Sequence, residues 1–183
     1  MDADLLFPRL AEVSRERNLP VLVIGGHAVN AYGYARTTLD ADFLIPESDL
    51  APWRHIIESW GFVWAMETPA FVKFKYLKPV PEAYTLDLMK VDGSTFGKLW
   101  NEKRERSFGS TRLMVANPLH LIALKLHAMR HPARFRQGKD LPDILHLIRI
   151  CQINTHDPEF LNILHQYASE DTRQLLDQFL RAE

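Results

Sequence analysis

Cysteine is the scarcest residue of this sequence, with Cys151 the single example in 183 residues. One thiol cannot form an internal disulfide, which excludes the class of small secreted domains that disulfides hold together. A chain of this length buries roughly 70% of its unfolded surface, so it needs neither a disulfide nor a structural metal to fold. We expect one globular unit, or a small domain with a lobe attached, in a reducing compartment.

Long apolar runs are also missing, since none approaches the ~20 residues that a membrane span requires. The start of the chain, MDADLLFPRL, is acidic and lacks the basic segment and apolar core of a signal peptide. Lysine and arginine number 22 and aspartate and glutamate 23, for a net charge of −1. This balance alone predicts no polyanionic partner, and we expect a cytoplasmic protein with no membrane partner.

The chain consists of two stretches with different secondary-structure patterns. Residues 1–115 mix short β-rich runs with helical patterns, whereas residues 117–183 have helical spacing almost throughout. The predicted fold class is therefore α+β, with a mixed or antiparallel sheet flanked by helices. We expect a first domain over residues 1–116 and a helical C-terminal lobe over residues 117–183.

Local patterns predict the individual elements. Alternating or apolar runs predict strands at residues 21–24, 39–45, 62–65, 70–77, 84–91 and 107–115. The third, fourth and fifth of these are expected to be antiparallel neighbours. Helical spacing predicts helices over residues 27–35, 49–60, 118–131, 141–151 and 158–181, the last with a break near Ser169.

The candidate chemistry concentrates in the segment VIGGHAVNAYGYARTTLDADFLI. Asp40 and Asp42 stand two residues apart in a predicted strand, so their carboxylates project from one face about 6–7 Å apart. Such a pair suits a hard cation such as Mg²⁺, which takes one or two protein carboxylates and fills its shell with water and phosphate oxygens. Gly25 and Gly26 lie between a predicted strand and a predicted helix, where a backbone without Cβ atoms allows a phosphate to approach. Either feature alone is usually a plain turn or a solvated strand end, but their joint spacing indicates phosphoryl transfer.

The order Gly25-Gly26, Arg36-x-Thr38-x-Asp40-x-Asp42 and then Asp87 within TLDLMKV resembles a known family. It is similar to the minimal nucleotidyltransferases of the DNA-polymerase-β-like superfamily. Their signature is a Gly-Gly or Gly-Ser turn, a helix, an Asp-x-Asp that opens a strand, and a third carboxylate on a later strand. The resemblance implies the nucleotidyltransferase fold.

A later stretch is similar to the helical motif of AbiEii-like nucleotidyltransferases, many of which are toxins of toxin–antitoxin pairs. Those proteins carry a lysine on one helix and a basic residue followed by Asp-x-x-Asp at the start of the next. Lys125 and Lys139-Asp140-x-x-Asp143 match that pattern. Together the two resemblances span about residues 20–150.

The resemblance implies an enzyme dependent on Mg²⁺ or Mn²⁺ that transfers an NMP from an NTP to an acceptor hydroxyl and releases pyrophosphate. Asp40, Asp42 and Asp87 would be its catalytic residues and metal ligands, with Asp87 on a second metal or acting as the general base. The nucleotide-binding residues that it implies are Gly25, Gly26, His27, Arg36, Lys125, Lys139 and Asp140. The expected acceptor is an RNA end, such as a tRNA 3′ end, or a protein hydroxyl. A cognate antitoxin is a further possible partner.

Several of these residues have a structural alternative. Asp87 is either catalytic or a carboxylate paired with a neighbouring lysine, and Asp92, in a predicted Asp-Gly turn, is the fallback for it. His27 either contacts the γ-phosphate or caps a helix, and the sequence does not separate the two. Arg36 either neutralises phosphate or pairs with one of the aspartates.

The basic side chains leave further alternatives open. Lys73 and Lys75 share one strand face and point either into a cleft or into solvent from an edge strand, and we favour the edge strand. Lys125 lies beside an apolar helical stripe, from which its long side chain could reach a triphosphate. Asp140 and Asp143 bracket a proline at a helix start, where N-capping is the default and a salt bridge to a lysine or arginine is the alternative.

Positive charge is concentrated between Lys98 and Lys139, and HPARFRQGK within it has the most RNA-like pattern. This stretch is either a phosphate-binding wall for nucleic acid or a solvated surface. Two other functions remain open: a small-molecule nucleotidyltransferase of the aminoglycoside type, and a non-catalytic module that binds nucleotide or RNA. The presence of all three carboxylates argues against the non-catalytic module.

Overall fold

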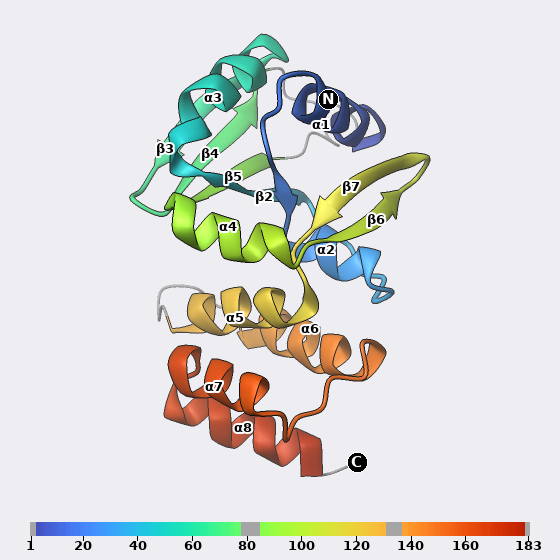
Figure 1. The fold of residues 1–183 in the computed structure, drawn as a ribbon, viewed down its shortest axis with the longest axis vertical. Helices are drawn as coiled ribbons and strands as arrows, with labels where there is room; N and C mark the ends of the chain where they lie inside the picture. Colours follow the sequence, from blue (N-terminus) through green and yellow to red (C-terminus); the bar gives the residue numbers. More distant parts are fainter. Residues whose placement is uncertain (1–2, 78–84, 131–136, 182–183) are drawn as a thin grey trace. The chain divides into compact units, whose positions relative to one another are not determined.

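The computed structural model describes residues 3–77, 85–130 and 137–181. Internal contacts group the chain into two compact units. The first takes in the described residues up to Ala31 and those from Ala35 to Ala116 (Figure 1). The second takes in Tyr32–Tyr34 and the described residues from Asn117 onward.

The first unit is built on a mixed sheet, seven-stranded over the described residues, with the order β3-β4-β5-β2-β1-β7-β6 (Figure 1). The strands are β1 (Leu22–Val23), β2 (Asp40–Pro46), β3 (Phe62–Glu67), β4 (Phe71–Tyr76), β5 (Thr85–Val91), β6 (Arg104–Phe108) and β7 (Thr111–Val115). β2 pairs in parallel with β5, and β1 with β7, whereas the other neighbours are antiparallel. The predicted α+β class is confirmed, as is the antiparallel order of the strands between residues 62 and 91.

Helices pack against this sheet within the first unit. They are α1 (Ala3–Glu16), α2 (Gly25–Ala31), the short 3₁₀ helix η1 (Glu47–Asp49), α3 (Leu50–Ser59) and α4 (Gly93–Asn101). α2 and α4 contact β2, α3 contacts β3, and α1 contacts β7. The sequence patterns predicted neither α1 nor α4.

Asp92 is the residue that begins α4. Its carboxylate accepts a hydrogen bond of 2.9 Å from the backbone N–H of Thr95 and one of 2.6 Å from the Thr95 hydroxyl. Both hydrogen bonds favour the charged carboxylate and hold the pKa of Asp92 below its ordinary value, and the bond from the Thr95 hydroxyl has the larger effect. Asp92 is therefore a helix N-cap, a role that differs from the predicted Asp-Gly turn.

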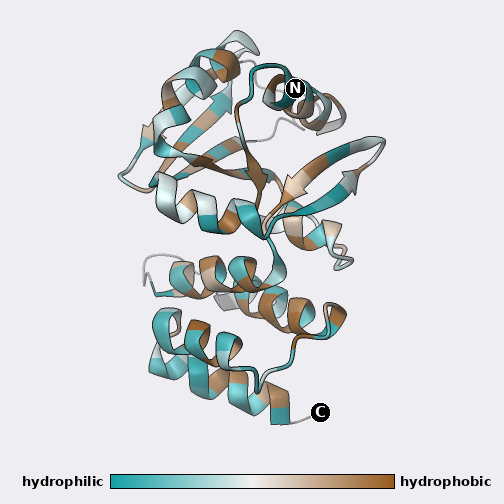
Figure 2. Cartoon of the chain, in the orientation of Figure 1, coloured by the Kyte–Doolittle hydropathy of each residue, from teal (hydrophilic) through white to brown (hydrophobic). Residues whose placement is uncertain are grey.

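β2 positions the Asp-x-Asp pair. Ala41 and the later residues Phe43–Ile45 are fully buried, and Figure 2 shows brown, hydrophobic colour along this strand. Asp40 opens the strand with an exposed side chain, and Asp42 is half-buried. Successive residues of a strand face opposite sides, so Asp40 and Asp42 share one face. The strand thus anchors itself in the core and presents two carboxylates where it begins.

The second unit is helical over its described residues. Its helices are α5 (Pro118–Met129), α6 (Gln137–Ile150), α7 (Pro158–Tyr167) and α8 (Glu170–Arg181). α5 packs on both α6 and α7, and Asn117 caps α5 by accepting a 2.9 Å hydrogen bond from His120 N–H. The ring of Tyr34 stacks on His146 with 3.7 Å between centroids, which joins the segment Tyr32–Tyr34 to α6.

Some predicted elements differ in the structure, and one predicted break is confirmed. The single strand predicted at 107–115 is wrong: β6 and β7 form a hairpin that turns at Gly109, where φ is +60°. Alternation that continues across a short turn does not reveal the turn. The helix predicted over residues 27–35 ends at Ala31. The predicted break near Ser169 is confirmed, because α7 and α8 are separated by Ala168 in an extended conformation.

Among the described residues, no helix has both the length and the apolar content needed to cross a membrane. The basic motif HPARFRQGK falls mainly on residues 131–136, which lie outside the described residues. The prediction of an RNA-binding loop at that motif therefore stays a prediction.

Candidate active site

A row of charged side chains crosses three adjacent strands of the sheet. Asp42 of β2 is in register with Asp87 of β5, and Asp87 is in register with Lys73 of β4. Residues in register on neighbouring strands project from the same face, about 5 Å apart. The predicted grouping of Asp40, Asp42 and Asp87 on one face therefore agrees with the strand pairing.

Gly25 makes room for the carboxylate of Asp42. A Cβ atom at Gly25 would lie 2.0 Å from Asp42 Oδ2, and the backbone φ there is +63°. Both the space and the conformation therefore require glycine. The sequence suggested another reason for this glycine, the approach of a phosphate, and that approach stays a prediction.

Lys73 contacts two of the three carboxylates. Its Nζ lies 3.2 Å from Asp87 Oδ2 and 4.0 Å from Asp40 Oδ1. β4 lies between β3 and β5, so the preferred edge-strand interpretation of Lys73 is wrong. The pairing of Asp87 with a neighbouring lysine, one of the alternatives from sequence, is present.

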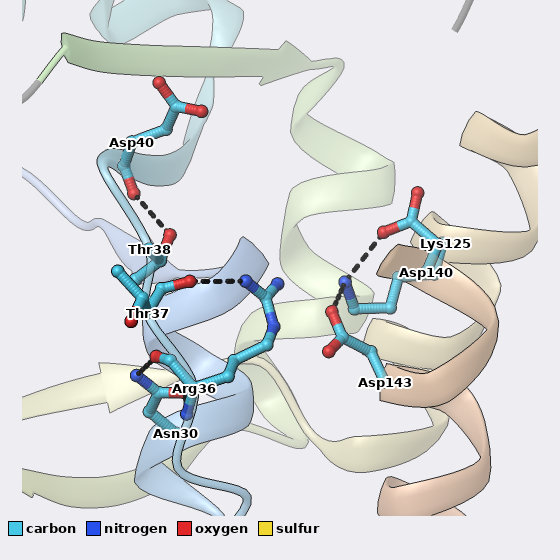
Figure 3. Close-up of polar contacts among 8 residues, drawn as sticks. All are labelled: Asn30, Arg36, Thr37, Thr38, Asp40, Lys125, Asp140 and Asp143. Atoms are coloured by element: carbon cyan, nitrogen blue, oxygen red, sulfur yellow. Dashed lines mark hydrogen bonds and ion pairs between the residues drawn. The ribbon is translucent and has the colours of Figure 1, made fainter. Parts of the chain in front are cut away.

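Asp40 is held by a second strand. The hydroxyl of Thr85, its register partner on β5, donates a short hydrogen bond to Asp40 Oδ1. The Thr38 hydroxyl donates to the Asp40 backbone carbonyl at 3.3 Å, as Figure 3 shows. These two threonines fix the point at which the chain enters β2.

Arg36 lies against the second glycine. Its Nη2 is 3.0 Å from the position that a Cβ atom would take at Gly26. The side chain of Asn30 donates to the Arg36 carbonyl at 2.8 Å and accepts from the Arg36 N–H at 3.1 Å (Figure 3). This amide clamp fixes the backbone of Arg36 and so places its guanidinium beside the start of α2.

His27 is a neutral residue of α2. Burial and, second, the charge of Arg36 lower the pKa of His27 from 6.5 to about 4. Its ring lies edge-on to Phe7, with 5.0 Å between centroids. Neutral at pH 7, His27 offers a phosphate hydrogen bonding but no positive charge.

Three other candidate residues meet in the second unit. Lys125 Nζ lies 3.0 Å from Asp140 Oδ1 and 2.6 Å from Asp143 Oδ2, and all three side chains are buried (Figure 3). The salt bridge that the sequence left as an alternative is present, and N-capping by these aspartates is wrong because α6 begins earlier, at Gln137. Lys139 is exposed near the start of α6.

The carboxylates of the first unit fit a hard divalent cation in donor type. Asp42 and Asp87 are in register on adjacent strands and supply two carboxylates, the number that Mg²⁺ takes from proteins. Within residues 3–77, 85–130 and 137–181, no group of three or more His, Cys, Asp or Glu side chains is placed to hold a metal ion. The predicted set of three metal ligands therefore stays a prediction.

Sequence reasoning missed Thr85 as a partner of Asp40, and it did not identify Lys73 as the lysine that pairs with Asp87. Knowledge of the register of β4, β5 and β2 would have identified both residues. Thr85 is the direct cross-strand neighbour of Asp40, and Lys73 is that of Asp87. The sequence indicates which residues share a strand face but not which strands are adjacent.

No protein-family model matches the sequence, and the curated proteins contain no match. Solved structures do match. The solution structure of antibiotic-resistance factor ANT(2″)-Ia is 14% identical, with a TM-score of 0.70 over 100% of both chains. A nucleotidyltransferase-like antigen from Paracoccidioides brasiliensis is 15% identical, with a TM-score of 0.61 over 100% of this chain and 95% of that one. Lincomycin-bound lincosamide adenylyltransferase LnuA is 15% identical, with a TM-score of 0.59 over 82% of this chain and 98% of that one. The chain has the nucleotidyltransferase fold, as predicted.

Replacing Gly25 by alanine is expected to destabilise the first unit. The new methyl group would overlap the Asp42 carboxylate, and alanine disfavours the positive φ by about 1 kcal/mol before any clash. Gly97→Ala in α4 is the matched control, because a Cβ atom there meets nothing within 4 Å and alanine favours helix. Urea unfolding should show a loss for Gly25→Ala and no loss for Gly97→Ala. Equal stabilities would contradict the packing of Asp42 on Gly25.

The partial burial of His27 and its lowered pKa predict a pH dependence of stability. Between pH 6.5 and about 4 the unfolded chain binds more protons at His27 than the folded chain does. The free energy of unfolding should therefore fall as the pH is lowered through this window, and His27→Gln should flatten the dependence. NMR titration should place the His27 ring near pH 4 and, in Arg36→Gln, at higher pH. A ring that titrates near 6.5 in the wild type would contradict the assignment.

Lys125→Met is expected to destabilise the helical unit by about 3–5 kcal/mol, because it leaves two buried carboxylates without their cation. Asp140→Asn keeps the 2.6 Å pair of Lys125 with Asp143 and should lose less. Chemical denaturation followed by circular dichroism measures both. A Lys125→Met protein as stable as the wild type would show that this ion cluster does not hold the helices.

Proposed function

We propose that this protein transfers a nucleoside monophosphate from an NTP to an acceptor hydroxyl. The observation that supports the proposal most directly is the register of Asp42 with Asp87 on adjacent parallel strands, next to Gly25 at the start of α2. Two carboxylates on one sheet face, in a chain with the nucleotidyltransferase fold, suit this chemistry better than they suit a core.

Positive charge for the triphosphate comes from Arg36 in this proposal. Its guanidinium lies beside Gly26, and the Asn30 clamp holds its backbone, so little freedom is lost when it binds phosphate. His27, neutral at pH 7, contributes shape and hydrogen bonding. Lys125 and Asp140 support the helical unit, and Lys139 stays a candidate for the nucleotide.

In the transfer, the acceptor oxygen bonds to the α-phosphorus while the bond to the leaving pyrophosphate breaks. The proton of the hydroxyl moves to the carboxylate of Asp87, which serves as the general base. Asp40, Asp42 and Asp87 would hold Mg²⁺ or Mn²⁺, whose bound charge stabilises the phosphate oxygens. Thr85 and Thr38 keep Asp40 in place for this role.

For the acceptor we propose an RNA end or a protein hydroxyl. The AbiEii-like pattern of Lys125 and residues 139–143 supports this choice, and with it a toxin function and a cognate antitoxin. Basic side chains on α4, β6, β7 and the connection between α4 and β6 offer contacts for a polyanion; they are Lys98, Lys103, Arg104, Arg106 and Arg112.

A small hydroxyl-bearing molecule is the second candidate acceptor. ANT(2″)-Ia has also been solved in complex with adenylyl-2″-tobramycin, with a TM-score of 0.69 and 16% identity to this chain, and LnuA with lincomycin. Both neighbours match this chain over most of their own length. Labelled NTPs offered with total RNA, with protein extract and with an aminoglycoside and lincosamide panel separate the acceptor classes by what becomes labelled.

Asp42→Asn and Asp87→Asn should each reduce NMP transfer by about 100-fold or more, the usual size of a lost general base or charge stabiliser. Asp92→Asn is the matched control, since Asp92 caps α4 and lies outside the carboxylate row. Label transfer from [α-³²P]NTP measures the rate, and thermal melting verifies folding. Full activity of Asp42→Asn would rule out the mechanism.

A further inference from the structure

We propose that Lys73 is a built-in counter-cation of the carboxylate row, which a divalent metal must displace. In this role Lys73 is a positioning residue that keeps the metal affinity of the nucleotide-free protein low. The metal then binds tightly only when the phosphates of the nucleotide add their own oxygens. The inference rests on the proposed function, because it assumes that the carboxylates bind a divalent cation.

The sheet leaves the Lys73 side chain little choice of direction. Its strand neighbours Val72 and Phe74 are fully buried on the opposite face, which fixes the register of β4 against β5. Lys73 must therefore rise from the face that carries Asp87. The side chain of Lys73 is 23% exposed and that of Asp87 is 20% exposed. The pair is therefore partly buried but still accessible to ions from solvent.

The ammonium also takes up oxygens that a metal would use. Nζ lies 3.2 Å from Asp87 Oδ2 and 4.0 Å from Asp40 Oδ1, so a single charge contacts carboxylates from two strands. A divalent ion at either carboxylate would stand a few ångströms from the ammonium and be repelled by it. Metal binding therefore requires Lys73 to swing away, which weakens the affinity.

Lys75 provides a matched control within the same strand. It lies two residues beyond Lys73, on the same face of β4, and its side chain is exposed. The structure gives Lys75 no ion pair with a described residue, and its cross-strand partner is Val63 of β3. Loss of either lysine changes the net charge equally, so only a local effect distinguishes them.

The experiment measures Mn²⁺ binding to the nucleotide-free protein by the EPR signal of free Mn²⁺. Lys73→Met, which keeps the apolar stem, should bind Mn²⁺ about tenfold or more tightly than the wild type, as expected when a unit charge is removed from beside a divalent ion. Lys73→Arg should stay close to the wild type, and so should Lys75→Met. Asp42→Asn should lose affinity, which locates the bound ion.

The outcomes separate this inference from the proposed function. If the wild type binds Mn²⁺ and Asp42→Asn does not, but Lys73→Met binds no more tightly, the counter-cation role is overturned and the metal site stands. An equal gain in Lys75→Met overturns it too, because the effect would be one of net charge. If neither the wild type nor Lys73→Met binds Mn²⁺, the inference and the metal-dependent part of the proposed function both fail.

A second measurement uses the wild-type protein alone, in case Lys73→Met does not fold. Lysine acylation by an N-hydroxysuccinimide ester, quantified by peptide mass spectrometry, reports how free each amine is. Adding Mn²⁺ without nucleotide should speed the labelling of Lys73 and leave Lys75 unchanged. Unaltered labelling of Lys73 at an Mn²⁺ concentration that saturates the site would overturn the proposal.

Discussion

The central constraint on the first unit is the repulsion between carboxylates that its sheet brings into register. Asp42 and Asp87 lie on adjacent strands, and two unit charges about 5 Å apart repel by about 3 kcal/mol at an effective dielectric constant near 20. Two features of the fold accommodate this pair of charges. Lys73 supplies a positive charge from β4, and Gly25 leaves the space that Asp42 occupies. This arrangement is costly for a strand whose other residues are packed in the core, and the proposed metal would reduce its cost.

The apolar part of β2 is what holds the charges in place. Phe43, Leu44 and Ile45 are consecutive and fully buried, so both faces of this part of β2 lie in the core. A slip of one residue would place the charged side chain of Asp42 where Ala41 or Phe43 is now fully buried, which is costly. The same slip would move Asp42 away from Asp87. Hydrophobic packing therefore fixes the register of the sheet, and the register in turn determines the geometry of the polar site.

Sequence patterns predicted those parts that depend on near neighbours. The spacing of Asp40 and Asp42 gave their shared face, and alternation identified the strand of Asp87. Contacts between distant segments were out of reach, because alternation indicates a face and not the adjacent strand. The sequence therefore favours an edge strand for Lys73, and it leaves Asp140 and Asp143 open between N-capping and a salt bridge. The hairpin of β6 and β7 was missed for a different reason: the two-residue turn Gly109-Ser110, with Gly109 at φ +60°, is a hairpin signal that the single strand predicted at 107–115 passed over.

Among the described residues, Lys125 and Lys73 each lie beside two carboxylates, and the two clusters differ in burial. Around Lys125 the side chains are 7%, 9% and 0% exposed, so solvent hardly reaches this cluster. Around Lys73 they are 23%, 20% and 53% exposed, so solvent reaches the cluster, as the proposed exchange of the ammonium for a metal ion requires. Removing a charge from the first cluster leaves an uncompensated buried ion, which costs stability. Removing it from the second leaves carboxylates that water already reaches, so the change appears in binding rather than in folding.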